Sequence, residues 1–241
     1  MGRHPWNVGL SIKSPMLDCV EHPPMSDLAA VRERIARAAD RAGRDPAGIL
    51  LLAVTKVFPA EIIREAHSLG LREFGENYVQ EFEGKAPLVA DLAGCRYHLI
   101  GHLQSNKSSR AAELFQTIQT VDSVKLAKRL DSSGRPLDVM IEVNLGGEEQ
   151  KSGVDAGGLA ELVQAIRACS NLQLRGLMTM PPWNEEPEAP RPIFRRLREL
   201  AQEHGLNELS MGMSHDLETA IEEGSTCVRV GTALFGKRKK A

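Results

Sequence analysis

Several features that would place a chain in a special class are scarce in this sequence. Aromatic residues make up only 4% of its 241 residues. Its cysteines, Cys19, Cys95, Cys169 and Cys227, lie far apart and form no C-x-x-C pair. This spacing is typical neither of a disulfide framework nor of a zinc site. We therefore expect no metal centre and a reducing, cytoplasmic setting.

Two further absences narrow the choice of partners. No apolar run approaches the ~20 residues that a membrane-spanning helix needs, so we expect no membrane segment. The net charge is −2, which gives no overall attraction to a polyanion, so we expect no nucleic-acid partner. The rest of the composition, 42% hydrophobic and 26% charged, is ordinary for a soluble protein.

Residues 1–24 differ from the rest of the chain. They contain four prolines and show no hydrophobic period. They also lack the apolar core and the small-residue cleavage site of a signal peptide. We expect a disordered N-terminal extension, or an upstream start codon, followed by one folded domain over residues 25–241.

From Leu28 onward, helical and strand-like segments alternate. The first helix is expected to start at a cap on Ser26 or Asp27 and to stop at Gly43. Strands are expected at 49–55, 72–77, 96–101, 117–122, 137–144, 172–180, 208–213 and 227–231. Helices are expected between them at 60–70, 78–90, 105–115, 124–131, 156–169, 193–204 and 215–223, with a helical turn from Thr232.

Eight such β/α units in roughly 215 residues predict an α/β fold, a single-domain TIM (β/α)8 barrel. An open, doubly wound sheet is the alternative. That fold usually carries a glycine-rich turn after its first strand, whereas here the first strand runs into Thr55 and Lys56 with no glycine nearby. The barrel is therefore the favoured architecture.

The carboxyl ends of the strands build the functional site of a TIM barrel. In this sequence those ends carry polar groups that we expect to face one mouth: Lys56, Asn77, His102 with Gln104, Asp122, Asn144, Thr179 with Met180, Gly212 with Ser214, and residues 229–232. His102 is a conceivable acid or base, but a loop histidine bonded to backbone is the expectation that we favour.

The stretch LLAVTKVFP, residues 51–59, places Lys56 at the end of an apolar strand. Partial desolvation disfavours the ammonium form and lowers the pKa of a lysine in such a position. The neutral amine can form a Schiff base with an aldehyde. A lysine that simply reaches from the strand end into solvent is the alternative interpretation.

The last two strands end in SMGMS, residues 210–214, and RVGT, residues 229–232. The loops after strands seven and eight are the usual phosphate site of this fold. Gly231 would let backbone approach an anion, while Ser214 and Thr232 offer hydroxyl groups. The same residues would serve equally as plain helix caps, and the sequence does not separate these two roles.

An amine and an anion cradle at one mouth suit a phosphorylated aldehyde, of which pyridoxal 5'-phosphate (PLP) is the common cofactor. We expect Arg229 to face the pyridine nitrogen. A guanidinium stays protonated and would keep that nitrogen unprotonated, which makes the ring a poor electron sink. The remaining possibilities for a bound PLP are racemisation or no reaction at all. A class I aldolase, with Lys56 bound to a sugar phosphate, is a further alternative.

Several long stretches resemble the pyridoxal-phosphate homeostasis protein family. They are LLAVTK, FGENYVQE, YHLIGHLQSNK, TVDSVKLAKRL, IEVNLGGEEQKSG, LRGLMTM, LSMGMSHDLETAI and GSTCVRVGTALFG, in this order from about residue 30 to residue 238. The resemblance implies that Lys56 is the cofactor lysine, that Ser214, Gly231 and Thr232 lie at the phosphate, and that Arg229 and Asn77 line the ring. Residues 1–24 and 181–192 fall outside it.

The resemblance also implies a function. Family members are described as PLP-binding proteins without a firmly assigned reaction, which keep PLP at safe levels and deliver it. Apo PLP-dependent enzymes would then be partners. The barrel also resembles the N-terminal domain of alanine racemase, whose second domain supplies a tyrosine base. The chain ends soon after Thr232, so we expect no such domain and rank a PLP-dependent racemase second. We expect a monomer.

Overall fold

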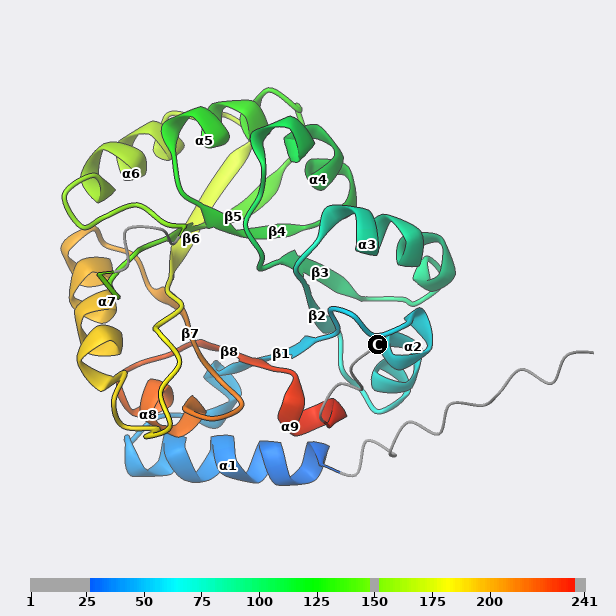
Figure 1. Ribbon diagram of the computed structural model, residues 1–241, viewed down its shortest axis with the longest axis vertical. Coiled ribbons are helices and arrows are strands. Elements are labelled where there is room, and N and C mark those ends of the chain that lie inside the picture. The colour runs from blue at the N-terminus through cyan, green and yellow to red at the C-terminus, as the bar shows by residue number, and fades with distance from the viewer. Residues whose placement is uncertain (1–26, 148–151, 237–241) are drawn as a thin grey trace, which may run out of the picture.

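Eight parallel strands close into a barrel in the computed structural model, which describes residues 27–147 and 152–236. The strands follow one another around the barrel in chain order (Figure 1). They are β1 (Leu50–Val54), β2 (Glu73–Glu76), β3 (Arg96–Leu99), β4 (Thr117–Val121), β5 (Leu137–Glu142), β6 (Leu172–Met178), β7 (Glu208–Met213) and β8 (Cys227–Val230). The predicted TIM barrel is confirmed. The expected extension over residues 1–24 lies outside the described residues.

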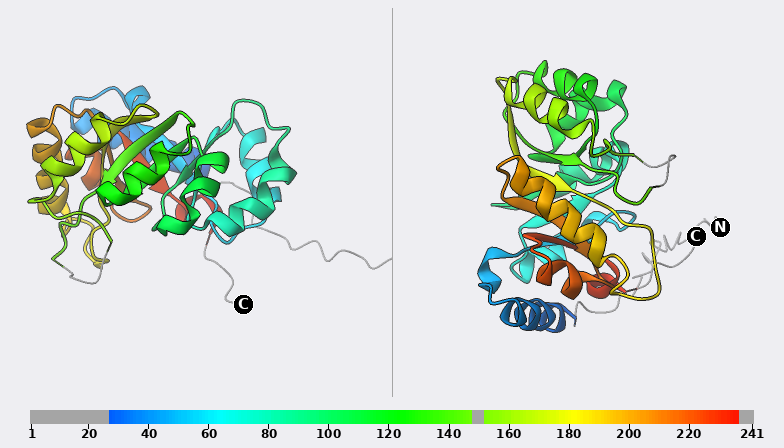
Figure 2. Two further views of the ribbon diagram at one scale, coloured as in Figure 1. Left: turned by 90° about the horizontal axis from the view of Figure 1, so that it is seen from above. Right: turned by 90° about the vertical axis from the view of Figure 1, so that its left-hand side faces the viewer.

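Helices form an outer layer around the strands, as the two side views also show (Figure 2). They are α1 (Leu28–Arg41), α2 (Ala60–Ser68), α3 (Val79–Lys85), α4 (Ser108–Leu114), α5 (Val124–Asp131), α6 (Leu159–Arg167), α7 (Arg191–Glu203), α8 (Leu217–Glu222) and α9 (Thr232–Phe235). Short 3-10 turns, at Pro46–Gly48, Ala86–Val89 and Ser105–Lys107, complete the connections.

Some boundaries differ from those expected. Helix α4 begins at Ser108 rather than at 105, because residues 105–107 form a 3-10 turn. Helix α7 begins at Arg191, two residues earlier than expected, with Pro192 in its first turn. Proline is tolerated there because the first N–H groups of a helix have no partner within it.

The pairing of β8 with β1 closes the barrel and joins the two ends that carry the candidate site. Ala53 lies opposite Val230 in the parallel register. One residue further, a Cβ atom placed on Gly231 would lie 3.4 Å from the Cβ atom of Val54. Lys56 and Thr232 therefore emerge at the same end of the barrel from neighbouring strands.

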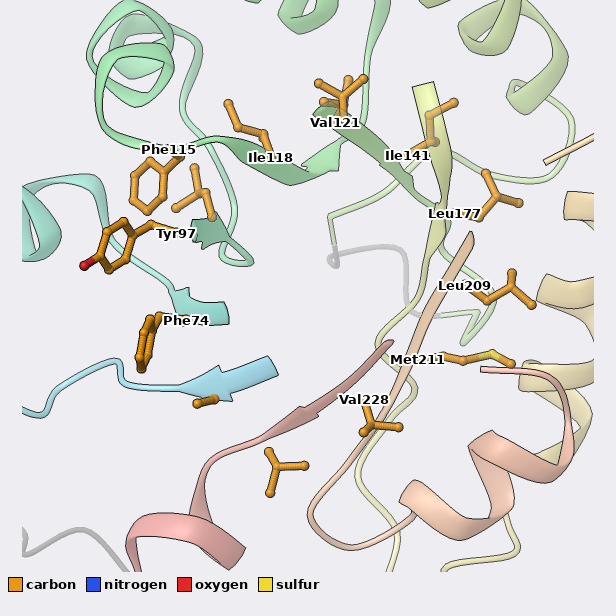
Figure 3. Packing of buried hydrophobic residues seen from close by; sticks show 14 of the residues in the cluster. Phe74, Tyr97, Phe115, Ile118, Val121, Ile141, Leu177, Leu209, Met211 and Val228 are labelled. Atoms are coloured by element: carbon orange, nitrogen blue, oxygen red, sulfur yellow. The ribbon is translucent and has the colours of Figure 1, made fainter. Parts of the chain in front are cut away.

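Alternate strand residues point outward and pack beneath the helices. Phe74, Tyr97 and Phe115 gather on one side of the barrel (Figure 3). The ring of Phe82 in α3 joins them, with its centroid 4.5 Å from that of Tyr97 and 5.0 Å from that of Phe115. Elsewhere, Leu177 and other aliphatic residues fill the layer between strands and helices.

The barrel interior is divided between two kinds of side chain. Apolar residues form a small separate cluster inside the barrel: Leu52, Val54, Ile100 and Cys227. Inward positions of β3, β4, β7 and β8 carry buried polar groups: His98, Gln119, Ser210 and Arg229. An unpaired polar group in such a place is costly, so their hydrogen-bond partners matter to both stability and function.

Helix α1 packs against α8, as Figure 1 shows below the barrel. Arg34 donates through Nε and Nη2 to the two carboxylate oxygens of Glu218, at 2.6 and 2.7 Å, and through Nη2 to the carbonyl oxygen of Ser214 at 3.0 Å. Such a bidentate contact fixes orientation as well as position. Helix α1 thereby helps to place the backbone of the loop that carries Ser214.

The described ranges contain neither a membrane-spanning helix nor a cluster of metal-binding side chains. None of their helices combines the length and the apolar character needed to cross a bilayer. The same ranges hold no group of three or more His, Cys, Asp or Glu side chains arranged to bind a metal ion.

Candidate functional site

A cavity of about 220 Å³ opens at the carboxyl ends of β1, β2, β7 and β8. It brings together all six residues that the sequence predicted for the site: Lys56, Asn77, Ser214, Arg229, Gly231 and Thr232. The rest of its lining comes from Val54, Ile100, Met180, Trp183, Met213 and His215. Half-buried Lys56 thus shares one cavity with the residues of the expected anion cradle.

The residue after Lys56 has an unusual backbone conformation. Val57 has φ of 61°, within the left-handed region, although it is neither glycine nor asparagine. A β-branched residue is strained there. Its N–H donates to Oε1 of Glu81 at 2.5 Å, and the next N–H, of Phe58, donates to the carbonyl oxygen of Thr55 at 3.1 Å. These two bonds hold the chain in a sharp turn around Lys56.

A second lysine, Lys85, supports this turn from below. Its Nζ atom donates to the carboxylate of Glu76 at 2.9 and 3.0 Å, to Oε1 of Glu81 at 2.6 Å and to the carbonyl oxygen of Thr55 at 3.0 Å. The hydroxyl of Thr55 donates to Glu76 at 2.8 Å. Lys85 is therefore a buried structural cation, and both neighbours of Lys56 in the chain are fixed to its network.

Asn77 presents an unpaired acceptor to the site. Its Oδ1 atom is buried and has no hydrogen-bond partner among the described residues. A buried amide oxygen in this state calls for a donor from a ligand or water. The neighbouring strand end allows the placement, because residue 101 is glycine: a Cβ atom there would lie 2.2 Å from the carbonyl oxygen of Asn77.

Ser214 connects the ends of β7 and β8. Its hydroxyl oxygen accepts the N–H of Ala233 at 3.2 Å, in the first turn of α9. Ser214 thus caps α9, whereas α8, the helix that follows it in the chain, has Asp216 at its cap position. Gly231 has φ of −118°, which other residues also adopt. Its lack of a side chain leaves bare backbone in the cavity wall.

Arg229 reaches the cavity from inside the barrel and is 4% exposed. Its Nη1 donates to the hydroxyl of Ser210 at 2.7 Å, and its Nη2 donates to the carbonyl oxygen of Thr179 at 3.0 Å. Burial lowers the pKa of the guanidinium, and the nearby Cys227, Asp216 and Glu142 oppose that shift. Within the described part of the chain, no carboxylate forms an ion pair with it.

The loop between β6 and α7 adds Trp183 to the cavity, a residue that the sequence reasoning missed. Trp183 is 74% exposed, and its ring centroid lies 6.4 Å from that of His215. Nε2 of His215 donates to the carbonyl oxygen of Glu185 at 2.8 Å. Figure 1 shows this loop running past β7 to α8, where Thr219 donates to Glu188 at 2.9 Å.

A second cavity of about 240 Å³ adjoins the first, since Ile100 and Met180 line both. It also contains His102, Glu142 and Ser152. Burial, reinforced by the nearby charge of Asp122, raises the pKa of Glu142 to about 7. Oε2 of Glu142 has no hydrogen-bond partner among the described residues.

The expectation that backbone would hold His102 is wrong. Nδ1 of His102 lies 3.0 Å from the hydroxyl of Ser152 and 3.5 Å from a carboxylate oxygen of Asp122. Loop contacts between residues that are far apart in the chain produce this arrangement, and no local pattern signals them.

Comparisons with known proteins identify the family of this chain. The model of the alanine racemase N-terminal domain family matches residues 26–239. The pyridoxal phosphate homeostasis protein of Pseudomonas aeruginosa is 50% identical over 218 residues, which cover 88% of this chain and 94% of that protein. The protein of the same name from Aquifex aeolicus is 46% identical over 222 residues, covering 88% and 97%. The chain belongs to the pyridoxal phosphate homeostasis protein family.

Solved structures agree with this family assignment. PipY of Synechococcus elongatus PCC7942, solved with PLP bound, is 39% identical, has a TM-score of 0.74, and matches over 86% of this chain and 100% of its own. Alanine racemase of Corynebacterium glutamicum is 21% identical with a TM-score of 0.63, and the match spans 61% of that longer chain. The second likeness shows the barrel fold alone.

The resemblance expected from the sequence motifs is therefore confirmed at the level of the family. As a homeostasis-family barrel, the chain has its lysine, its two strand-end loops and its buried arginine around one cavity. Three features of that cavity are visible only in the structure: the glycine that seats Asn77, the Lys85 network beneath Lys56, and the aromatic residue that the loop after β6 contributes.

Proposed function

We propose that this protein binds PLP as a Schiff base on Lys56 and serves intracellular PLP homeostasis and delivery, without catalytic turnover. The observation that carries the proposal is the convergence of Lys56 with Ser214, Gly231 and Thr232 on one cavity. An amine and an anion cradle in one cavity match the two ends of a phosphorylated aldehyde.

The residues present fit PLP. When bound, PLP supplies an aldehyde that condenses with amines and a ring that withdraws electrons. Lys56 would hold the aldehyde carbon. The hydroxyl groups of Ser214 and Thr232, with the bare backbone at Gly231, would hold the phosphate. The unpaired Oδ1 of Asn77 provides an acceptor at the cavity wall, where a buried oxygen without a partner favours a ligand.

The names and structures of relatives support the same ligand. The curated relatives are named for pyridoxal phosphate homeostasis, and PipY has been solved with PLP bound. The sequence identities, 39% to 50% over most of the chain, are high enough for us to propose the same cofactor here.

Two residues favour a carrier over an enzyme. Arg229, which we place at the pyridine nitrogen, stays protonated and would leave that nitrogen without a proton, so the ring would withdraw electrons weakly. His215 is the imidazole among the described lining residues, and its Nε2–H is bonded to the carbonyl oxygen of Glu185. A PLP-dependent racemase needs a strong electron sink or well-placed acid and base groups.

Optical spectroscopy of the purified protein with added PLP tests the binding step. We expect absorbance near roughly 420 nm, typical of a PLP Schiff base. Lys56→Ala should remove this band, whereas Lys107→Ala, at the same mouth, should keep it. A wild-type protein that takes up no PLP would contradict the proposal.

Chiral analysis of an amino-acid panel separates the carrier from the racemase: turnover of an amino acid would support the racemase instead.

Delivery requires a second experiment. The PLP-loaded protein is mixed with an apo PLP-dependent enzyme in the presence of semicarbazide, which traps free PLP. We expect the apo enzyme to gain activity faster than it does from an equal amount of free PLP under the same trap. Equal rates would mean release into solvent rather than transfer to a partner.

We also propose that the protein is a cytoplasmic monomer. Light scattering would check the oligomeric state, and cell fractionation would check the location.

A further inference from the structure

A continuous chain of hydrogen bonds crosses the interior of the barrel and ends at Arg229. Nη1 of Arg229 lies 2.7 Å from Oγ of Ser210, and Oγ of Ser210 lies 2.6 Å from Oε1 of Gln119. Nε2 of Gln119 lies 3.1 Å from Nδ1 of His98, and Nε2 of His98 lies 2.6 Å from a carboxylate oxygen of Glu73. We call these five side chains the barrel relay.

The chemistry of the groups gives the relay one direction. The guanidinium of Arg229 can only donate, so the hydroxyl of Ser210 accepts from it and donates its own proton to Oε1 of Gln119. In the orientation that Gln119 has here, its amide nitrogen faces His98 and can only donate, so Nδ1 of His98 accepts. The remaining ring nitrogen then carries the proton and donates it to Glu73. In this arrangement the proton of the His98 ring lies on Nε2.

The five members come from five strands: β8, β7, β4, β3 and β2. Ser210, Gln119, His98 and Arg229 are at most 5% exposed. Arg229 lines the cavity at the carboxyl ends of the strands, and Glu73, His98 and Gln119 line a cavity at the opposite end. The relay thus runs from the mouth to the base, with a cation at one end and a carboxylate at the other.

We propose that Ser210, Gln119 and His98 are positioning residues for Arg229, and that the hydrogen bonds of the barrel relay set the orientation that its guanidinium presents to a ligand in the mouth. The hydrogen bonds in a directed chain polarise one another, so each bond is stronger when the chain is complete. What Arg229 meets in the cavity rests on the proposed PLP function, whereas the relay itself is a property of this chain alone.

The state of His98 follows from the relay, because a proton on Nδ1 would remove the acceptor for Gln119. The polar groups at the base that surround His98 come from every neighbouring strand. They are Glu73, Arg96, Thr117, Gln119, Asp138, Arg175, Glu208 and Cys227. Arg96 pairs with Asp138 at 2.7 Å and Arg175 pairs with Glu208 at 3.0 Å, while Nε of Arg96 also lies 3.9 Å from the carboxylate of Glu73. Glu73 is the partner of the ring.

Nitrogen-15 NMR of the histidine rings in the full-length protein without PLP tests the relay directly. We expect His98 to show a protonated Nε2 and an unprotonated Nδ1. In Ser210→Ala the Gln119 amide loses its donor, so the His98 signals should shift. Ser225→Ala is the matched control: that hydroxyl is equally buried but donates to the carbonyl oxygen of Met211 at 2.7 Å, outside the relay. It should leave His98 unchanged.

The wild-type spectrum is decisive even if a variant folds poorly. His98 protonated on Nδ1 would overturn the proposal, and so would a Ser210→Ala spectrum in which His98 keeps its wild-type shifts. Either result would leave PLP binding by the wild-type protein intact. Conversely, a wild-type protein with the predicted tautomer that fails to bind PLP would overturn the proposed function and leave the relay standing.

A second measurement links the relay to the mouth. We expect Ser210→Ala and Gln119→Met to weaken PLP affinity by roughly three- to tenfold, the loss of one hydrogen bond's worth of binding, and to move the absorption maximum. Ser210→Thr keeps the hydroxyl and should recover the wild-type spectrum, while Ser225→Ala should match the wild type throughout. Equal losses in Ser210→Ala and Ser225→Ala would indicate a general packing effect and contradict a positioning role.

Discussion

The carbonyl oxygen of Asn77 lies 2.2 Å from the place that a Cβ atom would occupy at Gly101. No real Cβ atom tolerates such a contact with backbone, so the ends of β2 and β3 approach closely only because residue 101 is glycine. This contact seats Asn77, with its unpaired amide oxygen, in the wall of the site cavity.

Gly101→Ala should therefore displace Asn77. We expect a loss of roughly 1–3 kcal/mol in the free energy of unfolding, typical of overpacking. We also expect PLP binding to weaken by more than this loss of stability alone would cause. Urea titration and PLP titration check the two effects. Gly84→Ala is the control: apart from its chain neighbours and its own helix backbone, no atom lies within 4 Å of its Cβ position, and alanine favours the α3 helix. Unchanged PLP binding in Gly101→Ala would contradict this role.

Lys85→Met should be strongly destabilising. It leaves the buried carboxylate of Glu76 without its cation, a change that costs roughly 3–5 kcal/mol in other proteins. The double variant Lys85→Met with Glu76→Gln removes the stranded charge and should recover part of the loss. Denaturant unfolding of both variants measures the difference. If the double variant loses at least as much stability as Lys85→Met and Glu76→Gln lose together, the pairing of these residues is not the cause.

Glu142 predicts a dependence of stability on pH. Its folded-state pKa of about 7 lies above the ordinary value of 4.5, so the folded protein holds the proton more tightly than the unfolded chain. This contribution is fully present below pH 4.5 and is lost as the pH rises to about 7. Glu142→Gln should abolish this decline and stabilise the protein at pH 8 by up to about 3 kcal/mol. Parallel stability curves for both proteins would contradict it.

Trp183 should report on the cavity by fluorescence. Its indole lines the site cavity beside His215, so bound PLP should quench its emission by energy transfer. We expect PLP to reduce wild-type fluorescence in proportion to the absorbance of the bound cofactor. Trp183→Phe should remove most of this quenching and still bind PLP, because phenylalanine keeps an aromatic ring beside His215. Full quenching in that variant would place the cofactor elsewhere.

Local sequence patterns were sufficient for the barrel and for the strand-end residues. An apolar run that stops at Lys56, and an arginine followed by Gly231 and Thr232, mark the ends of strands, and in a closed parallel barrel all such ends meet at one mouth. That rule placed these residues at one mouth, and the family resemblance narrowed them to the six that line one cavity. It gave no information about side-chain partners.

The residues that the sequence did not reveal act through contacts between distant segments. Gly101 is required by the carbonyl group of Asn77, and His98 gains its role from Gln119 and Glu73 on other strands. Trp183 lies in a loop outside the family motifs, with no periodic pattern to place it. His102 was expected to bond to backbone, yet Ser152, far along the chain, holds it. Only the folded structure shows such pairings.

Borohydride reduction of the protein with PLP, followed by peptide mapping, is the most direct test of the central claim. Reduction fixes a Schiff base as a stable secondary amine, so the modified lysine can be identified by mass. We predict a single phosphopyridoxyl group on Lys56 at equimolar PLP, and none on Lys85, whose ammonium is bound by two carboxylates. Modification mainly at another lysine, with Lys56 unmodified, would contradict the account.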